Sequence, residues 1–169
     1  MTDAARPVVP PRADWPEPAP ETDAGAALTA VIMTTFRLNG RLMDAAQDMA
    51  GRGGLTTAWW QVIGGVLDEP RTVAEVGRRM GMARQGVQRI ADLLVARGLA
   101  EYRPNPAHRR AKLLACTEAG YHAVRQASVA QHPWADRIGS AVGADDLRAA
   151  LGVMQRLVDA LEGDGAAAR

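Results

Sequence analysis

A pair of short helices joined by a tight turn is the strongest pattern in this sequence, and it lies within residues 72–98. Thr72 and Glu75 have the S/T-x-x-E spacing of a capping box, in which each side chain bonds a free backbone N–H of the first helical turn. Gly81 ends this first helix, and a second helix is expected over about residues 83–97, before another glycine. Two helices joined by a glycine-containing turn form a helix-turn-helix motif.

A short β-hairpin is predicted directly after this motif. Two strand-like runs, residues 99–103 and 111–116, flank the chain-breaking sequence Pro104-Asn105-Pro106. The tip of the hairpin is rich in cationic side chains. A basic hairpin that follows a helix-turn-helix is the wing of a winged helix.

The rest of the chain favours helix. Apolar residues make up 47% of the sequence but aromatic residues only 4%, and Ala, Leu and Met favour helix over strand. Periodic apolar positions and caps predict further helices over about residues 24–49, 57–67, 117–131 and 144–161, with Pro133 as a helix breaker. The fold class is therefore mainly α, a winged helix-turn-helix with a small β-hairpin wing and long N- and C-terminal helices.

The positive charge is concentrated in one part of the chain. Residues 71–112 contain ten Lys or Arg residues and only three acidic residues, although the net charge of the whole chain is +1. A basic segment within an otherwise acidic chain indicates a surface that binds a polyanion such as DNA. A solvated surface that is merely rich in arginine is the alternative.

Several classes of protein are disfavoured. No apolar run approaches the roughly 20 residues that span a bilayer, and the N-terminus lacks the pattern of a secretory signal, so we expect a cytoplasmic protein without a membrane segment. No glycine-rich phosphate loop or catalytic triad suggests an enzyme, and we expect no cofactor. Cys116 is the only cysteine and the three histidines are scattered, so we expect a structural thiol and no bound metal.

The second helix of the motif has one apolar side and one polar side. At 100° per residue, one side that would dock the helix carries Val87, Ile90, Ala91 and Leu94. We expect no apolar residue on the opposite, free side. Arginine can bond guanine, and glutamine can bond adenine, through two hydrogen bonds in the major groove. The candidate DNA-binding residues are Arg84, Gln85, Gln88 and Arg89 on this helix and Arg103, His108, Arg109 and Arg110 on the wing.

Residues 72–120 resemble the MarR family of transcriptional regulators. The wing in that family commonly reads Asp-Pro-x-Asp-Arg-Arg and is followed by a strand and Leu-Thr-x-x-Gly. The matching positions here are Asn105, Pro106, Arg109, Arg110, Thr117 and Gly120. Two residues depart from the pattern: His108 replaces an acid that often pairs with a wing arginine, and Ala83 replaces the usual Ser or Thr at the start of the second helix.

The resemblance implies a homodimer formed by the terminal helices that binds a pseudo-palindromic operator in double-stranded DNA. It also implies a repressor, which a small aromatic effector releases from DNA. The division of the chain then reads: residues 1–23, a disordered proline-rich arm; 24–54, an N-terminal dimerisation helix; 55–118, the winged helix-turn-helix lobe; 119–169, C-terminal dimerisation helices and a short tail.

Two questions stay open at the level of sequence. The helix that carries Trp59 and Trp60 borders the region where relatives bind effectors, so these residues are candidates for an effector pocket, and core packing of both is the alternative that we favour. The winged helix could also serve as a protein-interaction module without specific DNA binding.

Overall fold

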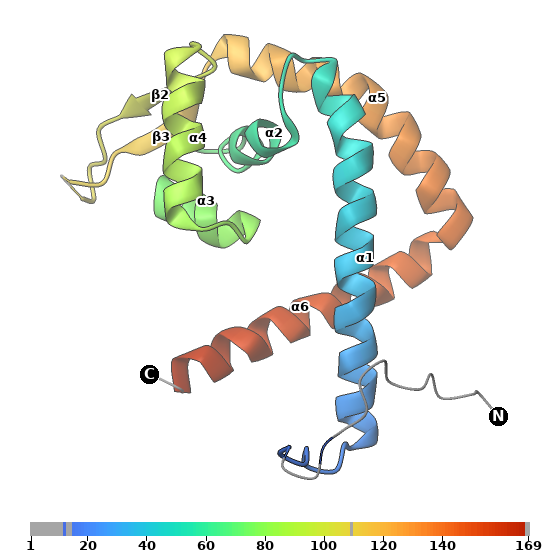
Figure 1. Ribbon diagram of the computed structural model, residues 1–169. Coiled ribbons are helices and arrows are strands. Elements are labelled where there is room, and N and C mark those ends of the chain that lie inside the picture. Colours follow the sequence, from blue (N-terminus) through green and yellow to red (C-terminus); the bar gives the residue numbers. More distant parts are fainter. Residues whose placement is uncertain (1–11, 13–14, 109, 168–169) are drawn as a thin grey trace. The chain divides into compact units, whose positions relative to one another are not determined.

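The computed structural model describes residues 12, 15–108 and 110–167, and most of them are helical (Figure 1). Within this part of the chain the helices are α1 (Asp23–Gly51), α2 (Thr57–Gly64), α3 (Val73–Met80), α4 (Arg84–Ala96), α5 (Glu118–Val142) and α6 (Ala144–Ala167), and the strands are β1 (Arg71–Thr72), β2 (Ala100–Arg103) and β3 (Leu113–Cys116). The prediction of a mainly helical winged helix is confirmed. No helix in the described ranges combines the length and the apolar character needed to cross a bilayer.

The chain forms two compact units, Met1–Arg41 and Leu42–Arg169. In the first unit, Arg12 and residues 15–22 belong to no helix or strand, and the N-terminal part of α1 follows. Most of the predicted disordered arm lies outside the described residues. Large apolar side chains on this part of α1 are exposed to solvent, namely Leu28, Val31, Ile32, Met33, Phe36 and Leu38.

The helix-turn-helix forms in the second unit as the sequence predicts. The Thr72 hydroxyl accepts a hydrogen bond from the Glu75 amide at 3.3 Å, and the Glu75 carboxylate accepts one from the Thr72 amide at 2.7 Å. Gly81 ends α3 in the left-handed conformation, with φ of 63°, which a residue without Cβ adopts at little cost. The three fully buried side chains of α4, Val87, Ala91 and Leu94, dock this helix on the core.

The wing is part of a three-stranded antiparallel sheet with the order β1-β3-β2. Tyr102 of β2 pairs with Leu114 of β3, and Arg71 of β1 pairs with Leu114 from the other side. The sequence did not predict β1, because a strand of two residues is too short to show an alternating pattern. This third strand ties the base of the wing to the start of α3.

Helix α5 contradicts the prediction that Pro133 ends a helix near residue 131. It continues through the proline to Val142 and is bent along its length (Figure 1). Proline removes one backbone donor and disfavours the helix interior, but tertiary packing can outweigh that cost. Gln131 and Trp134, on either side of the proline, are partly buried against the rest of the second unit.

The turn between α2 and β1 is held by Arg71. Its guanidinium donates to the carbonyl of Gly65 at 2.8 Å and to the carboxylates of Asp68 and Glu69, each at 2.7 Å. The hydrogen bond that Arg71 donates to Asp68 holds the pKa of that carboxyl group well below its usual range. Arg71 thereby fixes β1 relative to the helix before it.

Candidate nucleic-acid interface

The exposed face of α4 carries the four polar side chains that the sequence singled out. Arg84, Gln85, Gln88 and Arg89 all lie in the first two turns of the helix and are exposed. Within the described residues, neither arginine makes an ion pair or hydrogen bond with another side chain. Ala83 is the N-cap and supplies no side-chain hydrogen bond, so the first amides of α4 stay available to an external acceptor.

Gln88 lies in a compact hydrogen-bonded cluster with two residues that the sequence did not single out. Its Nε2 lies 2.8 Å from the Tyr102 hydroxyl and 3.0 Å from Asp92 Oδ1, and the Tyr102 hydroxyl donates to the same Oδ1 at 2.7 Å. Burial and the bond to Asp92 raise the pKa of Tyr102 to about 12. Tyr102 lies on β2, so the cluster joins the wing to α4.

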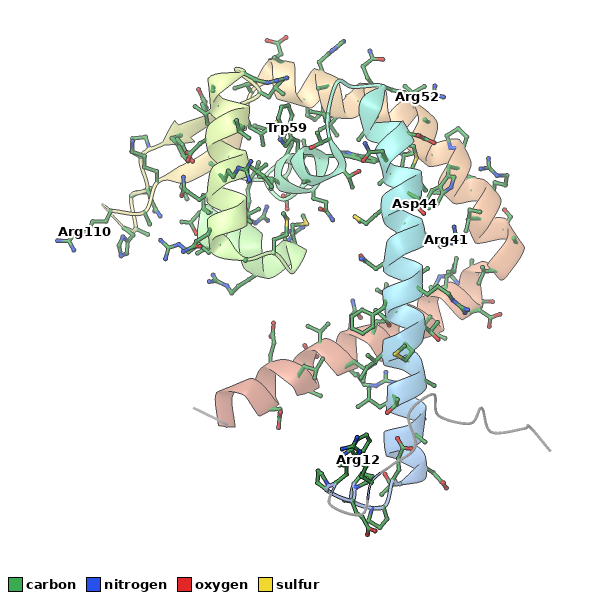
Figure 2. All side chains as sticks on the ribbon, in the orientation of Figure 1. Arg12, Arg41, Asp44, Arg52, Trp59 and Arg110 are labelled. Carbon is green, nitrogen blue, oxygen red and sulfur yellow. The ribbon has the colours of Figure 1, made fainter. Side chains whose placement is uncertain are left out.

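The wing residues differ in how available their charges are. Arg103 is paired with Glu101, with N–O distances of 2.7 and 2.6 Å, so its charge is partly neutralised. His108 is exposed, and Arg110 extends from the tip of the hairpin (Figure 2). Arg109 lies outside the described residues.

A cleft of about 540 Å³ lies between α4, the start of α3 and the wing. Its lining includes the side chains of Arg84, Arg110 and Lys112, and no acidic residue. Lys112 was missed as a site residue, although the basic composition of the segment included it. Three cations around one cleft form a surface that suits phosphate groups.

One expectation about α4 is wrong. Leu93 is 42% exposed and borders the same shallow surface as Gln85, Gln88 and Arg89. The sequence placed no apolar residue on this face. Leu93 lies in the third turn of α4, four residues after Arg89, so the helical repeat places the two side chains on the same side of the helix.

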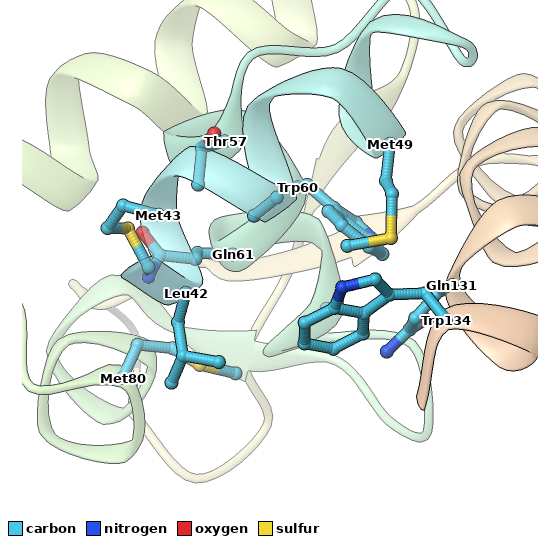
Figure 3. A pocket seen from close by; sticks show the side chains of 11 residues that line it. Leu42, Met43, Met49, Thr57, Trp60, Gln61, Met80, Gln131 and Trp134 are labelled. Atoms are coloured by element: carbon cyan, nitrogen blue, oxygen red, sulfur yellow. The ribbon is translucent and has the colours of Figure 1, made fainter. Parts of the chain in front are cut away.

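A second cavity, of about 320 Å³, lies between the C-terminal part of α1, α2 and α5 (Figure 3). Figure 3 shows the indole of Trp134 reaching from α5 toward the α2 side chains. The side chains that line the cavity are apolar apart from two amides and one hydroxyl, and none is charged: Leu42, Met43, Ala46, Met49, Thr57, Trp60, Gln61, Met80, Gln131 and Trp134.

The two adjacent tryptophans of α2 have different surroundings. Both pack partly buried against the core, and Trp60 also lines the cavity. Trp59 lies under the guanidinium of Arg97, 4.6 Å from its ring centre, and is absent from the cavity lining. Trp134 could not be paired with Trp60 from sequence, because 74 positions separate them and the fold alone brings them together.

Two observations concern metal binding and thiol reactivity in the described part of the chain. No three His, Cys, Asp or Glu side chains gather there closely enough to hold a metal ion. Burial raises the pKa of the Cys116 thiol, which lowers the share of reactive thiolate. The absence of a metal or cofactor stays a prediction.

Comparisons with known proteins agree with this geometry. A family model described as the MarR family matches residues 53–111. The uncharacterized protein Rv2011c of Mycobacterium tuberculosis is 36% identical over 137 residues, which cover 81% of this chain and 96% of that protein. The chain belongs to the MarR family.

Solved structures show how far the MarR fold extends along the chain. CouR from Rhodococcus jostii RHA1, bound to p-coumaroyl-CoA, has a TM-score of 0.68 at 20% identity, covering 75% of this chain and 90% of CouR. The transcriptional repressor CouR bound to a 23-mer DNA duplex has a TM-score of 0.66 at 22% identity, covering 82% and 99%. These likenesses show a shared fold that includes helices beyond the winged helix-turn-helix.

The family assignment gives the two sites their context. MarR-family members are transcription regulators rather than enzymes, and the match over residues 53–111 contains every candidate DNA-binding residue and both candidate tryptophans. Trp134, α5 and α6 lie outside it. The candidate DNA-binding residues therefore all lie within the matched region, whereas the cavity is lined in part by residues outside it.

Proposed function

We propose that this protein is a homodimeric, sequence-specific DNA-binding repressor that a small aromatic effector releases from its operator. One observation carries the DNA-binding part: exposed arginines without ion-pair partners and exposed amides on the first two turns of α4 continue into the cationic cleft that leads to the wing. Recognition helices contact base edges mainly near their N-terminal ends. Arginines on a wing can bond phosphates or enter a narrow minor groove.

The DNA-binding proposal predicts a clear preference for one sequence. Fluorescence anisotropy of the purified protein should show tighter binding to the duplex upstream of its own gene than to a scrambled duplex, at low and at physiological salt. Equal binding to both duplexes that disappears with salt would mean phosphate attraction alone. That result would favour the protein-interaction module, for which exposed Leu93 would be a docking residue.

The dimer is supported by exposed apolar side chains on α6. An apolar seam recurs there at spacings of three and four residues: Leu147, Leu151, Met154, Val158 and Leu161 are each at least 43% exposed. Such a seam suits packing against a second helix. A contiguous exposed apolar surface on a helix indicates an interface, and the proposed occupant is a second copy of this chain.

Replacing Leu151 by Glu should convert the dimer to a monomer, because a carboxylate would lose water in the middle of the apolar seam. Light scattering after size-exclusion chromatography at micromolar concentration measures the mass directly. Ala149→Glu, which adds a carboxylate at an exposed position on the opposite side of α6, is the matched control and should stay dimeric. A wild-type protein that is monomeric in this measurement would refute the proposed dimer.

The effector part rests on the cavity between α1, α2 and α5. Two indoles, several methionines and two amides line a volume of about 320 Å³, which suits one small ring system. Because no charged side chain lines it, an anionic ligand would lose its hydration without gaining a counter-charge. The effector class that fits is therefore an uncharged aromatic molecule with a hydrogen-bonding group for Gln61 or Gln131.

An uncharged probe such as benzamide should quench tryptophan fluorescence at lower concentration than benzoate, which has a similar size but a negative charge. Trp60→Phe should weaken the binding of benzamide about tenfold, since one large contact surface is reduced. Trp59→Phe is the control, because Trp59 does not line the cavity. Tighter binding of benzoate, or equal effects of both substitutions, would contradict the proposed effector class.

A further inference from the structure

The cluster of Gln88, Tyr102 and Asp92 determines which end of the Gln88 amide faces the protein. A carboxylate only accepts hydrogen bonds, so only Nε2 of Gln88 and the hydroxyl of Tyr102 can donate to Asp92. With its proton directed to Asp92, the Tyr102 oxygen is left to accept from Nε2. The distances of 2.7, 2.8 and 3.0 Å satisfy all three contacts at once.

The shape of the cluster also shows how much of the amide remains unused. The three atoms form a nearly equilateral triangle, so the directions from Nε2 to Tyr102 Oη and to Asp92 Oδ1 differ by a little less than 60°. This angle is about half the angle between the two N–H bonds of a planar amide, so one N–H that points between the acceptors can serve both and leave the second N–H unused. The carboxylate repels Oε1, which favours use of the N–H that points away from that oxygen.

We propose that Tyr102 and Asp92 are positioning residues that hold Gln88 with Oε1 and its second N–H directed outward, which makes Gln88 a reader of adenine. Adenine presents an acceptor, N7, beside a donor, N6–H₂, in the major groove, and this pair complements the free amide edge. Guanine presents two acceptors there, so its O6 would face Oε1 without a proton between them. The inference rests on the proposed DNA-binding function.

The position of Tyr102 adds a link between the wing and base recognition. Tyr102 belongs to β2, pairs with Leu114 of β3 and is half-buried, so its hydroxyl is fixed by the sheet. An exposed glutamine without such partners rotates freely and loses side-chain entropy on binding. A glutamine that is already held in one orientation loses less side-chain entropy on binding, and it favours one base more strongly.

The test is a competition assay in which each base pair of the operator is varied in turn. The full-length wild-type protein should prefer A·T at one position of each half-site, by roughly fivefold to a hundredfold, and Gln88→Ala should abolish that preference. Tyr102→Phe, which removes only the hydroxyl, and Asp92→Asn, which also lets the amide reverse, should each reduce it at least about threefold. The preferences at the other positions should stay unchanged. If Tyr102 and Asp92 only stabilised the fold, their replacement would weaken the preferences at all positions.

Tyr121→Phe removes a hydroxyl from an exposed tyrosine of α5 and should leave every preference unchanged. Circular dichroism melts show whether each variant is folded at the assay temperature. If Gln88→Ala loses the A·T preference while Tyr102→Phe and Asp92→Asn keep it, the positioning role is refuted but DNA recognition stands. A wild-type protein without preference at any position would refute the proposed function, and this inference with it.

Discussion

Replacing Arg84 and Arg89 together by alanine is expected to lower the affinity for the operator at least about a thousandfold. Each bidentate contact between an arginine and a base contributes roughly 1–3 kcal/mol, and a dimer would lose four such contacts. Both guanidinium groups are exposed on the first two turns of α4 and have no ion-pair partner among the described residues. Their removal leaves no buried acidic side chain without a partner, so the double substitution should weaken DNA binding without lowering the stability of the protein.

The matched control changes the net charge by the same amount at a distance from α4. Arg125 and Arg137 are exposed on α5, and their joint replacement by alanine should lower affinity only severalfold through long-range attraction. Anisotropy titrations at two salt concentrations separate the two effects, because lost phosphate contacts reduce the salt dependence. Equal losses in the two double variants would show that α4 makes no specific contacts.

Arg103 gives a further distinction within the wing. It is bonded to Glu101 through two nitrogens, whereas Arg110 extends from the tip (Figure 2). A contact from Arg103 to phosphate would first have to break or share that pair. We therefore rank Arg110 above Arg103 as a DNA contact, an order that the sequence could not supply.

The local signals in the sequence were sufficient for the helix-turn-helix. A capping box at Thr72 and Glu75 and a left-handed glycine at Gly81 each specify a backbone conformation within a few residues. Pro133 was a local signal too, but the packing of its neighbours on other helices outweighed it. Prediction from neighbouring residues fails where the length of a helix depends on packing against residues far away in the chain.

The candidate site divides in the same way. Gln88 was found from its angle on one helix, and Asp92, four residues later, could have been paired with it by the helical repeat. Tyr102 could not, because the alignment of β2 against α4 depends on how the whole sheet docks. The cavity was harder still, since choosing between Trp59 and Trp60 requires the positions of α1 and α5.

Gly120 is a position where a substitution should strongly reduce the stability of the fold. It is buried in the first turn of α5, where an added Cβ would lie 2.0 Å from the backbone oxygen of Leu99 and 3.0 Å from Cys116 Sγ. The same turn is held by the Thr117 hydroxyl, which donates to the carbonyl of Gly98 at 2.6 Å. Any side chain at position 120 must therefore move the start of α5 away from the end of α4.

Gly120→Ala is expected to lower the free energy of unfolding by about 3 kcal/mol or more, because the clashing atom belongs to the backbone and cannot rotate away. For a lobe of this size that loss corresponds to a fall in Tm of roughly 10–20 °C, measurable by circular dichroism. The strain should also tilt α5 and so disturb Trp134, which would change the fluorescence of the folded variant.

Gly86→Ala tests whether the effect is steric or only the loss of a glycine. Gly86 is exposed within α4, and an added Cβ there meets no atom within 4 Å. Alanine is the better helix former by about 1 kcal/mol, so this variant should be as stable as the wild type or more so. If both variants lose stability to the same degree, the close approach of α5 to Leu99 is not what requires a glycine at position 120.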